Sequence, residues 1–516
     1  MSGGAGMSGA GTPTRLTARQ VIDHVVDPGT FVGWDAPVSY TPHDAAYEAD
    51  LQASRERSGE DESVITGEGR VRGRRVALVV CEFRFLAGSI GVAAADRLVQ
   101  AIERATREGL PLLAGPSSGG TRMQEGTLAF LSMVKITAAV RRHKEAGLPY
   151  LVYLRHPTTG GVMASWGSLG HITVAEPGAL VGFLGPRVFE ALYGRAFPSG
   201  VQLAENLHEK GIIDAVLPAD ELADTVHRVL SLLQPEPATN VPAPDTLSVA
   251  PSSAPAWESV ERSRNPRRPG VRTLLRYGAA DVLPLNGTGQ GEKDHGLLLA
   301  LASFGQVPCV VLGQERPRPG SDTALGPAAL REARRGMRLA EELDLPLLTL
   351  IDTAGAALSR EAEEGGLAGE IARCLNDLVG LQCPTVSVLL GQGAGGGALA
   401  LLPADRTIAA WHSWLSPLPP EGASAIVHRD TDHGAEMAEH QGISASALHR
   451  HGVVDHLVDE RPDAALEPAE FSRRLAAAIA WELASLRSQP RQAMLARRLT
   501  KYHRLGSADS AGIALL

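Results

Sequence analysis

Two glycine clusters are the residues of this sequence best suited to chemistry. Gly160 and Gly161 follow an apolar run and open the segment VMASWGSLG (162–170), and the cluster Gly391–Gly397 follows a second apolar run. Glycines at such a turn let the backbone bend sharply and leave N–H groups unpaired at the start of a helix. Unpaired N–H groups in a dry site stabilise negative charge that develops on oxygen. Each cluster therefore predicts an oxyanion hole, with a tight packing turn as the alternative.

The two clusters occupy matching places in two halves of the chain. Four landmarks recur in the same order and at nearly constant spacing, which predicts an internal duplication. Both halves would then present N–H donors at the same point of the repeated unit. The landmarks are PLL at 111–113 and 346–348, Pro149 and Pro384, Gly160-Gly161 and Gly396-Gly397, and GIIDAVL from Gly211 with GVVDHLV from Gly452.

Strands and helices alternate around these turns. Runs rich in Val, Leu and Tyr predict strands, and amphipathic segments ending near Gly or a charged turn predict helices. Their alternation predicts an α/β fold. The expected strands are 74–83, 148–154, 307–315, 346–352 and 385–390, and the expected helices are 127–147, 162–170, 328–343 and 370–381.

A proline-rich segment separates the halves. Eight prolines fall between residues 234 and 270, among Ser, Ala and Thr, and this composition is typical of a semi-extended linker. The sequence therefore predicts a first domain at 1–233, a linker at 234–270 and a second domain at 271–516.

Composition excludes several classes of protein. The net charge is −9, and no long Lys/Arg run offers a surface for nucleic acid. The four cysteines form no C-x-x-C pair, so they are expected to be buried thiols in a reducing compartment. Residues 1–14 lack the features of a signal peptide, and the charge-free run 378–404 is broken by glycines, which argues against membrane insertion. These observations predict a cytoplasmic protein. The 16 histidines show no metal-binding spacing, so no metal is expected.

The second cluster also matches a dinucleotide-binding pattern. Gly391, Gly393 and Gly396 satisfy G-x-G-x-x-G after a predicted strand. The acidic residue that such a site places about 20 positions later is missing, since Trp411 and His412 stand there. The glycine string alone is a weak indication of a nucleotide site.

A serine-hydrolase pattern occurs in the first half. Residues 115–119 read GPSSG and fit the G-x-S-x-G elbow, with Asp214 and His227 downstream. Pro116 stiffens the loop where an elbow is strained, and the chain continues as Gly120-Thr121-Arg122 instead of entering an apolar helix. A hydrolase would require Ser117 for activity.

Several independent blocks of sequence resemble a known family. The first half resembles the β subunit of the bacterial acetyl-CoA carboxylase carboxyltransferase, and the second half resembles its α subunit, so the chain is similar to a β–α fusion. Together the blocks cover most of residues 65–460. They are SSGGTRMQEG (117–126), PTTGGVMASWGSLG (157–170), AEPGALVGFLGPRV (175–188), HEKGIIDAVLP (208–218), LPLLTLIDTAGA (345–356), VSVLLGQGAGGGALAL (386–401), PEGASAIV (420–427) and the tail around HGVVDHLVD.

The resemblance implies a fold and a reaction. The fold would be two crotonase-like domains, each with a ββα superhelical core. The activity would move a carboxyl group from carboxybiotin to the α carbon of a short acyl-CoA, most simply acetyl-CoA to malonyl-CoA. In this family biotin supplies the base, and the protein stabilises two oxyanions and positions the partners. The active site would form between protomers, which implies a homo-oligomer.

The resemblance also assigns roles to residues of this chain. Gly160 and Gly161 would hold the thioester oxygen, and Gly396, Gly397 and Ala398 would hold the ureido oxygen of biotin. The acyl-CoA side would include Phe85–Ser89, the loop after Ser117, a pocket floor and a cation for a phosphate. The substrate-binding residues implied are Gly88, Ser89, Ser118, Gly119, Gly120, Arg122 and Ala400.

Partners follow from what the chain lacks. It has no Ala-Met-Lys-Met biotinylation motif, so carboxybiotin is expected on a separate carrier protein that a separate biotin carboxylase loads. The four-cysteine zinc ribbon of the β subunit is also missing, so its roles do not transfer. The departures Ala354, Ala394 and Ala423, and a shorter, less basic segment at 313–330, leave the acyl-chain preference and partner docking open.

Two rival functions remain at this point. A malonyl-thioester decarboxylase would use the same enolate chemistry in reverse. A catalytically silent partner of another carboxyltransferase would keep the fold without turnover.

Overall fold

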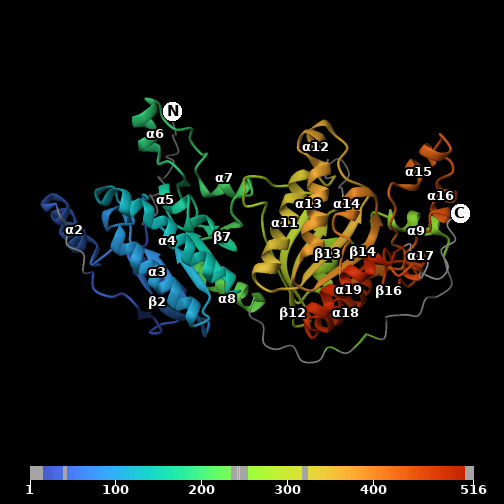
Figure 1. Ribbon diagram of the computed structural model, residues 1–516, viewed down its shortest axis with the longest axis horizontal. Helices are drawn as coiled ribbons and strands as arrows, with labels where there is room; N and C mark the ends of the chain where they lie inside the picture. The colour runs from blue at the N-terminus through green and yellow to red at the C-terminus, as the bar shows by residue number, and fades with distance from the viewer. Residues whose placement is uncertain are drawn as a thin grey trace, which may run out of the picture. The chain divides into compact units, whose positions relative to one another are not determined.

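The computed structural model describes residues 15–38, 44–233, 241, 243–244, 254–316 and 324–505 (Figure 1). The chain divides into two compact units, which are described separately. One unit contains Met1–Glu205 and Val216–His227, and the other contains Asn206–Ala215 and Arg228–Leu516. The domain limits 1–233, 234–270 and 271–516 stay a prediction, because much of the linker, the tail 1–14 and part of 313–330 lie outside the described residues.

A seven-stranded sheet forms the centre of the first unit. Its first strands pair antiparallel, and from β3 through β4 and β5 to β7 they run parallel. Parallel strands covered on both faces are apolar throughout, which explains why all residues of YLVYL in β5 are buried. In sheet order the strands are β1 (Val32–Gly33), β2 (Val64–Val71), β3 (Arg74–Cys81), β4 (Leu112–Gly115), β5 (Tyr150–Leu154), β7 (Ile172–Ala175) and β9 (Ala215–Val216).

Helices connect the parallel strands of this sheet. The predicted helix at 127–147 is confirmed as α4, and it packs against α3. The predicted helix at 162–170 is wrong: α5 is only one turn, and Ser165 leaves helical geometry with φ −138° and ψ −117°. The chain there closes on itself, because a Cβ at Gly167 would lie 2.8 Å from the Val162 carbonyl oxygen. The helices are α1 (Ala18–Val25), α2 (Ala45–Ser58), α3 (Val92–Arg107), α4 (Gly126–Glu145), α5 (Gly160–Met163), α6 (Pro186–Tyr193), α7 (Ala204–Glu209) and α8 (Leu222–Leu233).

The second unit repeats the same sheet. Its seven strands again begin with antiparallel pairs and continue as parallel ones, from β12 to β16. This repetition confirms the predicted duplication and the α/β class. In sheet order the strands are β10 (Asp281–Pro284), β11 (Leu297–Phe304), β12 (Val307–Gln314), β13 (Leu347–Thr353), β14 (Thr385–Gly393), β15 (Arg406–Ala410) and β16 (His456–Val458).

Buried ion pairs fix the last helices of the second unit to the sheet. Arg498 of α19 forms a two-pronged pair with Asp405, at 2.9 and 2.6 Å, and both side chains are almost fully buried. Long helix α18 covers β11, β14 and β15. The helices are α9 (Ala256–Ser263), α10 (Val271–Gly278), α11 (Pro327–Glu342), α12 (Arg360–Glu364), α13 (Leu367–Gly380), α14 (Gly395–Leu399), α15 (Pro420–Val427), α16 (Gly434–His440), α17 (Ala445–Arg450), α18 (Pro468–Arg487) and α19 (Arg491–His503).

Two expectations from composition can be compared with the structure. All four cysteines are buried free thiols, as predicted, and burial raises the pKa of Cys81 to about 11. Among the described residues, no helix combines the length and apolar character that a membrane crossing requires.

Candidate active site

The first glycine turn joins the short strand β6 (Thr158–Thr159) to α5. Gly160 has φ +64°, a left-handed conformation that glycine adopts without strain. Its N–H donates to the Phe183 carbonyl at 2.8 Å, so it has no hydrogen left for a substrate. The Gly161 N–H donates no hydrogen bond outside its own helix among the described residues. The predicted pair of donors is therefore reduced to Gly161, with Gly160 forming the turn.

The backbone of a second loop lies against this turn. A Cβ at Gly160 would sit 3.2 Å from the Gly120 Cα, and a Cβ at Gly161 would sit 2.9 Å from the Thr121 hydroxyl oxygen. The predicted residues Ser118 and Gly120 are buried here, whereas Gly119 is exposed. The Gly119 N–H donates to the Ala87 carbonyl at 2.9 Å, and the Gly120 N–H donates to the Ser118 hydroxyl at 3.0 Å. The loop 118–121 thus forms one wall beside the Gly161 N–H.

The predicted segment Phe85–Ser89 forms a strained turn next to this wall. Leu86, Ala87 and Gly88 have φ of 43°, 55° and 64°. A left-handed conformation costs a non-glycine residue about 1–2 kcal/mol. No residue with a side chain fits at Gly88, because its Cβ would lie 2.0 Å from the Ser117 carbonyl oxygen. Ser89 lies beside it and its carbonyl accepts from Arg122 at 2.8 Å.

Arg122 has a structural position, which argues against the predicted phosphate contact. Its side chain is 1% exposed. The guanidinium pairs with the Glu62 carboxylate and lies 3.2 Å from Glu125, and it also donates to Ser63 and Ser89. Burial lowers the pKa of Arg122, but the hydrogen bond and charge of Glu62, together with Tyr47, raise it above its usual value. With its donors used inside the protein, it has none for a ligand.

The second glycine turn joins β14 to α14. The Ala394 N–H donates to the Thr353 carbonyl at 3.1 Å, and the Gly395 N–H donates to the Ser416 carbonyl at 2.9 Å. The next three N–H groups, of Gly396, Gly397 and Ala398, donate no hydrogen bond outside their own helix among the described residues. The Val162 N–H, of the third residue of α5, likewise donates no hydrogen bond outside its own helix among the described residues, so both turns leave candidate N–H donors.

A buried network that the sequence reasoning missed holds this second turn. The Gln314 side chain is 1% exposed, and its amide nitrogen donates to the Gly397 carbonyl at 2.6 Å. Its amide oxygen accepts from the Asp352 N–H at 3.2 Å, and the Asp352 carboxylate accepts from the Gln392 N–H at 3.0 Å. Arg316 pairs with the same carboxylate. The only available signal was a polar residue at the end of a predicted apolar strand.

Ala400 is fully buried one residue after α14, and its N–H donates to the Gly396 carbonyl at 2.9 Å. This contact ties the end of the helix to its glycine start. Ala400 thus fixes the turn, and its place at a pocket floor stays a prediction.

The serine-hydrolase pattern is not assembled. The Ser117 hydroxyl donates to the His156 backbone carbonyl at 3.0 Å, and Ser117 is 1% exposed. A nucleophilic serine instead needs a base side chain within hydrogen-bond reach. Ser117 is therefore a structural residue of the loop.

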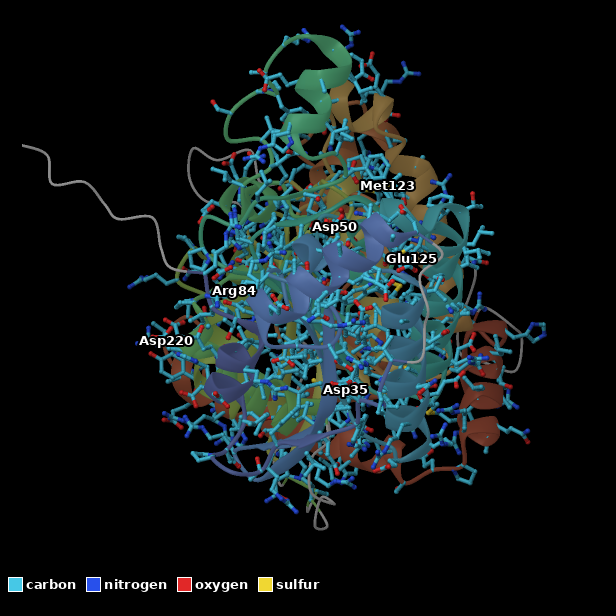
Figure 2. All side chains as sticks on the ribbon, turned by 90° about the vertical axis from the view of Figure 1, so that its left-hand side faces the viewer. Asp35, Asp50, Arg84, Met123, Glu125 and Asp220 are labelled. Carbon is cyan, nitrogen blue, oxygen red and sulfur yellow. The ribbon has the colours of Figure 1, made fainter. Side chains whose placement is uncertain are left out.

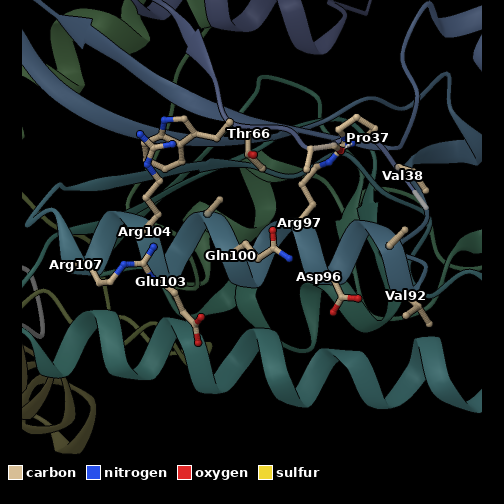
Figure 3. Close-up of a pocket in the computed structure, with 14 residues that line it drawn as sticks. Pro37, Val38, Thr66, Val92, Asp96, Arg97, Gln100, Glu103, Arg104 and Arg107 are labelled. Carbon is tan, nitrogen blue, oxygen red and sulfur yellow. Dashed lines mark hydrogen bonds between the residues drawn. The ribbon is translucent and has the colours of Figure 1, made fainter. Parts of the chain in front are cut away.

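A cavity of about 640 Å³ lies along α3 (Figure 3), and no residue of either glycine turn lines it. Two of the three arginines that line it interact with other side chains of the protein. Arg97 pairs with Asp35 and Asp61, and the Arg104 guanidinium lies 4.3 Å from the centre of the Trp34 ring. This arrangement gives the cavity no evident reactive group. Among the described residues, no three His, Cys, Asp or Glu side chains are grouped to hold a metal ion.

Comparisons with known proteins show the family of this chain. The family model described as "Carboxyl transferase domain" matches residues 12–495. A protein of Mycobacterium tuberculosis H37Rv, named "Probable biotin-dependent acyl-coenzyme A carboxylase beta3 subunit", is 61% identical over 96% of this chain and 99% of its own length. A Parafrankia protein named "Acetyl-coenzyme A carboxylase carboxyl transferase subunits beta/alpha" is 34% identical over 97% of this chain and 88% of its own.

The fold is also similar to a solved structure. Transcarboxylase 12S superposes with a TM-score of 0.73 over 92% of this chain and 91% of its own, at 21% sequence identity. The likeness confirms the predicted crotonase-like fold in two domains.

Proposed function

Because the chain belongs to the carboxyl transferase family, we propose that it moves a carboxyl group from carboxybiotin on a separate carrier to the α carbon of a short acyl-CoA. One observation supports this most: the duplicated halves each leave main-chain N–H groups unpaired at the matching glycine turn. A reaction that creates an oxyanion on each of two substrates needs such donors twice.

The residues of this chain act by positioning and by electrostatics. The Gly161 N–H stabilises the negative charge that grows on the thioester oxygen when the α carbon loses its proton. The N–H groups of Gly396, Gly397 and Ala398 face the other oxyanion. Biotin supplies the carboxyl group and the base, so the lack of a catalytic histidine or carboxylate at either turn fits the reaction. Loop 118–121 and the turn Phe85–Ser89 line the acyl-CoA side.

Acetyl-CoA is the acyl substrate that we propose to test first. The supporting evidence is the name of the Parafrankia relative, which is 34% identical, whereas the relative at 61% identity is named only for acyl-coenzyme A. A biotin carboxyl carrier protein and a biotin carboxylase are the proposed partners.

Exposed apolar surfaces support the proposed homo-oligomer. Helix α6 buries none of its residues, and the first half of α4 exposes its apolar side chains to solvent. Patches of this kind on a soluble protein mark contact surfaces. The exposed apolar side chains in and next to these two helices are Met123, Leu128, Phe130, Leu131, Val134, Phe183, Val188, Leu192 and Tyr193. Light scattering on the purified chain should give a mass above that of one chain.

Incorporation of labelled bicarbonate tests the function. The chain is mixed with biotin carboxylase, loaded carrier, ATP and a panel of acetyl-, propionyl-, butyryl- and longer acyl-CoA thioesters. We expect acid-stable label that depends on both the chain and the acyl-CoA. If the carrier becomes carboxylated but no thioester is labelled, the chain is a silent partner. In a separate reaction the chain is given malonyl-CoA; if malonyl-CoA is consumed there and the panel gives no labelled product, the chain is a decarboxylase.

A further inference from the structure

Helix α2 packs on the turn Phe85–Ser89, which lines the proposed acyl-CoA side. Tyr47 and Leu51 of this helix are buried in a small apolar cluster with Phe85, and Leu86 packs against the cluster. The helix lies outside the blocks of sequence that carry the family resemblance. It therefore adds a support to the acyl-CoA side that the sequence analysis did not include.

The tyrosine hydroxyl of the same helix reaches the residues that follow loop 118–121. The Tyr47 hydroxyl donates to the Glu125 carboxylate, and a guanidinium nitrogen of Arg122 donates to this hydroxyl at 3.3 Å. Burial, with the hydrogen bond to Glu125, raises the pKa of Tyr47, so the phenol keeps its proton and remains a donor. Figure 2 shows Asp50 of α2 and Glu125 on the same side of the first unit.

The turn needs contacts from outside because its backbone is strained. Leu86 and Ala87 have φ of 43° and 55°, which residues other than glycine keep only where their surroundings hold them. The Ala87 carbonyl accepts from the Gly119 N–H at 2.9 Å, and the Ser89 carbonyl accepts from Arg122 at 2.8 Å. Hydrogen bonds thus hold the turn from the side of the loop, and α2 holds it through the apolar cluster.

We propose that Tyr47 is a positioning residue that clamps the turn Phe85–Ser89 to loop 118–121, and that the affinity for acyl-CoA depends on its hydroxyl. The ring packs with the turn, and the hydroxyl binds Glu125, which comes four residues after the loop. Tyr47 is 4% exposed, so it acts through these neighbours. The inference rests on the proposed function, which assigns acyl-CoA to this side of the unit.

Tyr47→Phe removes the hydroxyl and keeps the ring. The ring still packs with Leu51 and Phe85, whereas the Glu125 carboxylate loses a donor and Arg122 loses an acceptor. Hydrogen bonds to charged groups are the stronger ones, so we expect the KM for acyl-CoA to rise about five- to tenfold. The kcat should stay within about twofold of the wild type, because the N–H groups of both glycine turns are unchanged.

Calorimetric titration of the full chain with CoA, beside initial-rate carboxylation with loaded carrier, tests the clamp. Tyr153→Phe is the matched control. Tyr153 is a buried tyrosine of β5 in the same unit, and its hydroxyl donates to the Leu217 carbonyl at 3.4 Å. We expect Tyr47→Phe to weaken CoA binding by the same factor as it raises the KM, and the control to bind CoA like the wild type.

Glu125→Gln tests the route from Tyr47 to the loop. The amide keeps the shape of the side chain but removes the charge that the Tyr47 hydroxyl and Arg122 bind. We expect the double variant to bind CoA no more weakly than Glu125→Gln alone, because both changes remove the same contact. If the two effects multiply, Tyr47 acts independently of Glu125 and the clamp is overturned.

The outcomes separate the clamp from the proposed function. Unchanged CoA affinity in Tyr47→Phe, with normal carboxyl transfer, overturns only the clamp. Weaker CoA binding in this variant, with no carboxyl transfer to any acyl-CoA by the wild type, overturns only the proposed function. If the wild type binds no CoA, both fail. A kcat that falls as much as the CoA affinity shows a general loss of order around the site and also overturns the clamp.

Discussion

Gln314→Met removes the contact that fixes the second glycine turn while keeping the volume of the side chain. The Gly397 carbonyl and the Ala398 N–H belong to one rigid peptide unit, so the 2.6 Å bond from Gln314 sets the direction of that N–H. Methionine can neither donate to Gly397 nor accept from Asp352. Leaving buried polar groups unpaired costs about 1–3 kcal/mol. If the peptide unit rotates to recover a partner, one oxyanion donor is lost.

The expected effect is a fall in kcat of about 10- to 1000-fold, the range from a tilted donor to a missing one. The KM for acyl-CoA should stay the same, because the Gln314 network holds the second glycine turn, which we propose binds the oxyanion of biotin. The assay is initial-rate carboxylation with loaded carrier. Gln382→Met is the control, since the side chain of Gln382 donates only to the Gly380 carbonyl at the end of α13. A kcat within about twofold of the wild type, in a variant that is folded at the assay temperature, would refute the reasoning.

Three further changes follow from other parts of the structure. Gly161→Val should abolish carboxyl transfer, because the valine side chain would press on the Thr121 hydroxyl. Circular dichroism should show that the variant is folded. Normal transfer rates would contradict the role of the Gly161 N–H as an oxyanion donor. Arg498→Met should lower the free energy of unfolding by about 3–5 kcal/mol by leaving Asp405 buried without its partner, and an unchanged urea midpoint would contradict this. Burial raises the pKa of Glu332 to about 7. Between pH ~4.5 and ~7 the folded chain therefore keeps a proton that the unfolded chain has lost, and stability should fall by up to about 3 kcal/mol as pH rises through this window. Glu332→Gln should flatten that slope in thermal melts; the same slope in the variant would exclude this carboxyl.

The two-domain architecture could be predicted from the sequence because the duplication repeats the same landmarks in both halves at nearly constant spacing. Buried parallel strands such as β5 are made of apolar and aromatic residues, and the residues at 160 and 396 must be small, so both features are visible without coordinates. The helix expected at 162–170 is wrong because the chain leaves helical geometry at Ser165 and turns back, so that Gly167 lies against the Val162 carbonyl.

The candidate site was predicted only in part, because hydrogen bonds between distant segments decide which groups are free. Gly160 and Gly161 are equivalent in sequence, yet only Gly160 donates to Phe183. The sequence predicted that Arg122 contacts a phosphate, but its guanidinium pairs with the carboxylate of Glu62, which lies 60 positions away in the chain. The sequence showed Gln314 only as a polar residue at the end of an apolar strand, because its partners Asp352 and Gly397 come from other strands and turns.

A crystal structure of the chain with an acyl-CoA bound would test the central claim most directly. The account predicts the thioester oxygen within about 2.7–3.2 Å of the Gly161 nitrogen. A thioester oxygen held by a side chain or a metal ion, with the Gly161 N–H bonded to the protein, would contradict it.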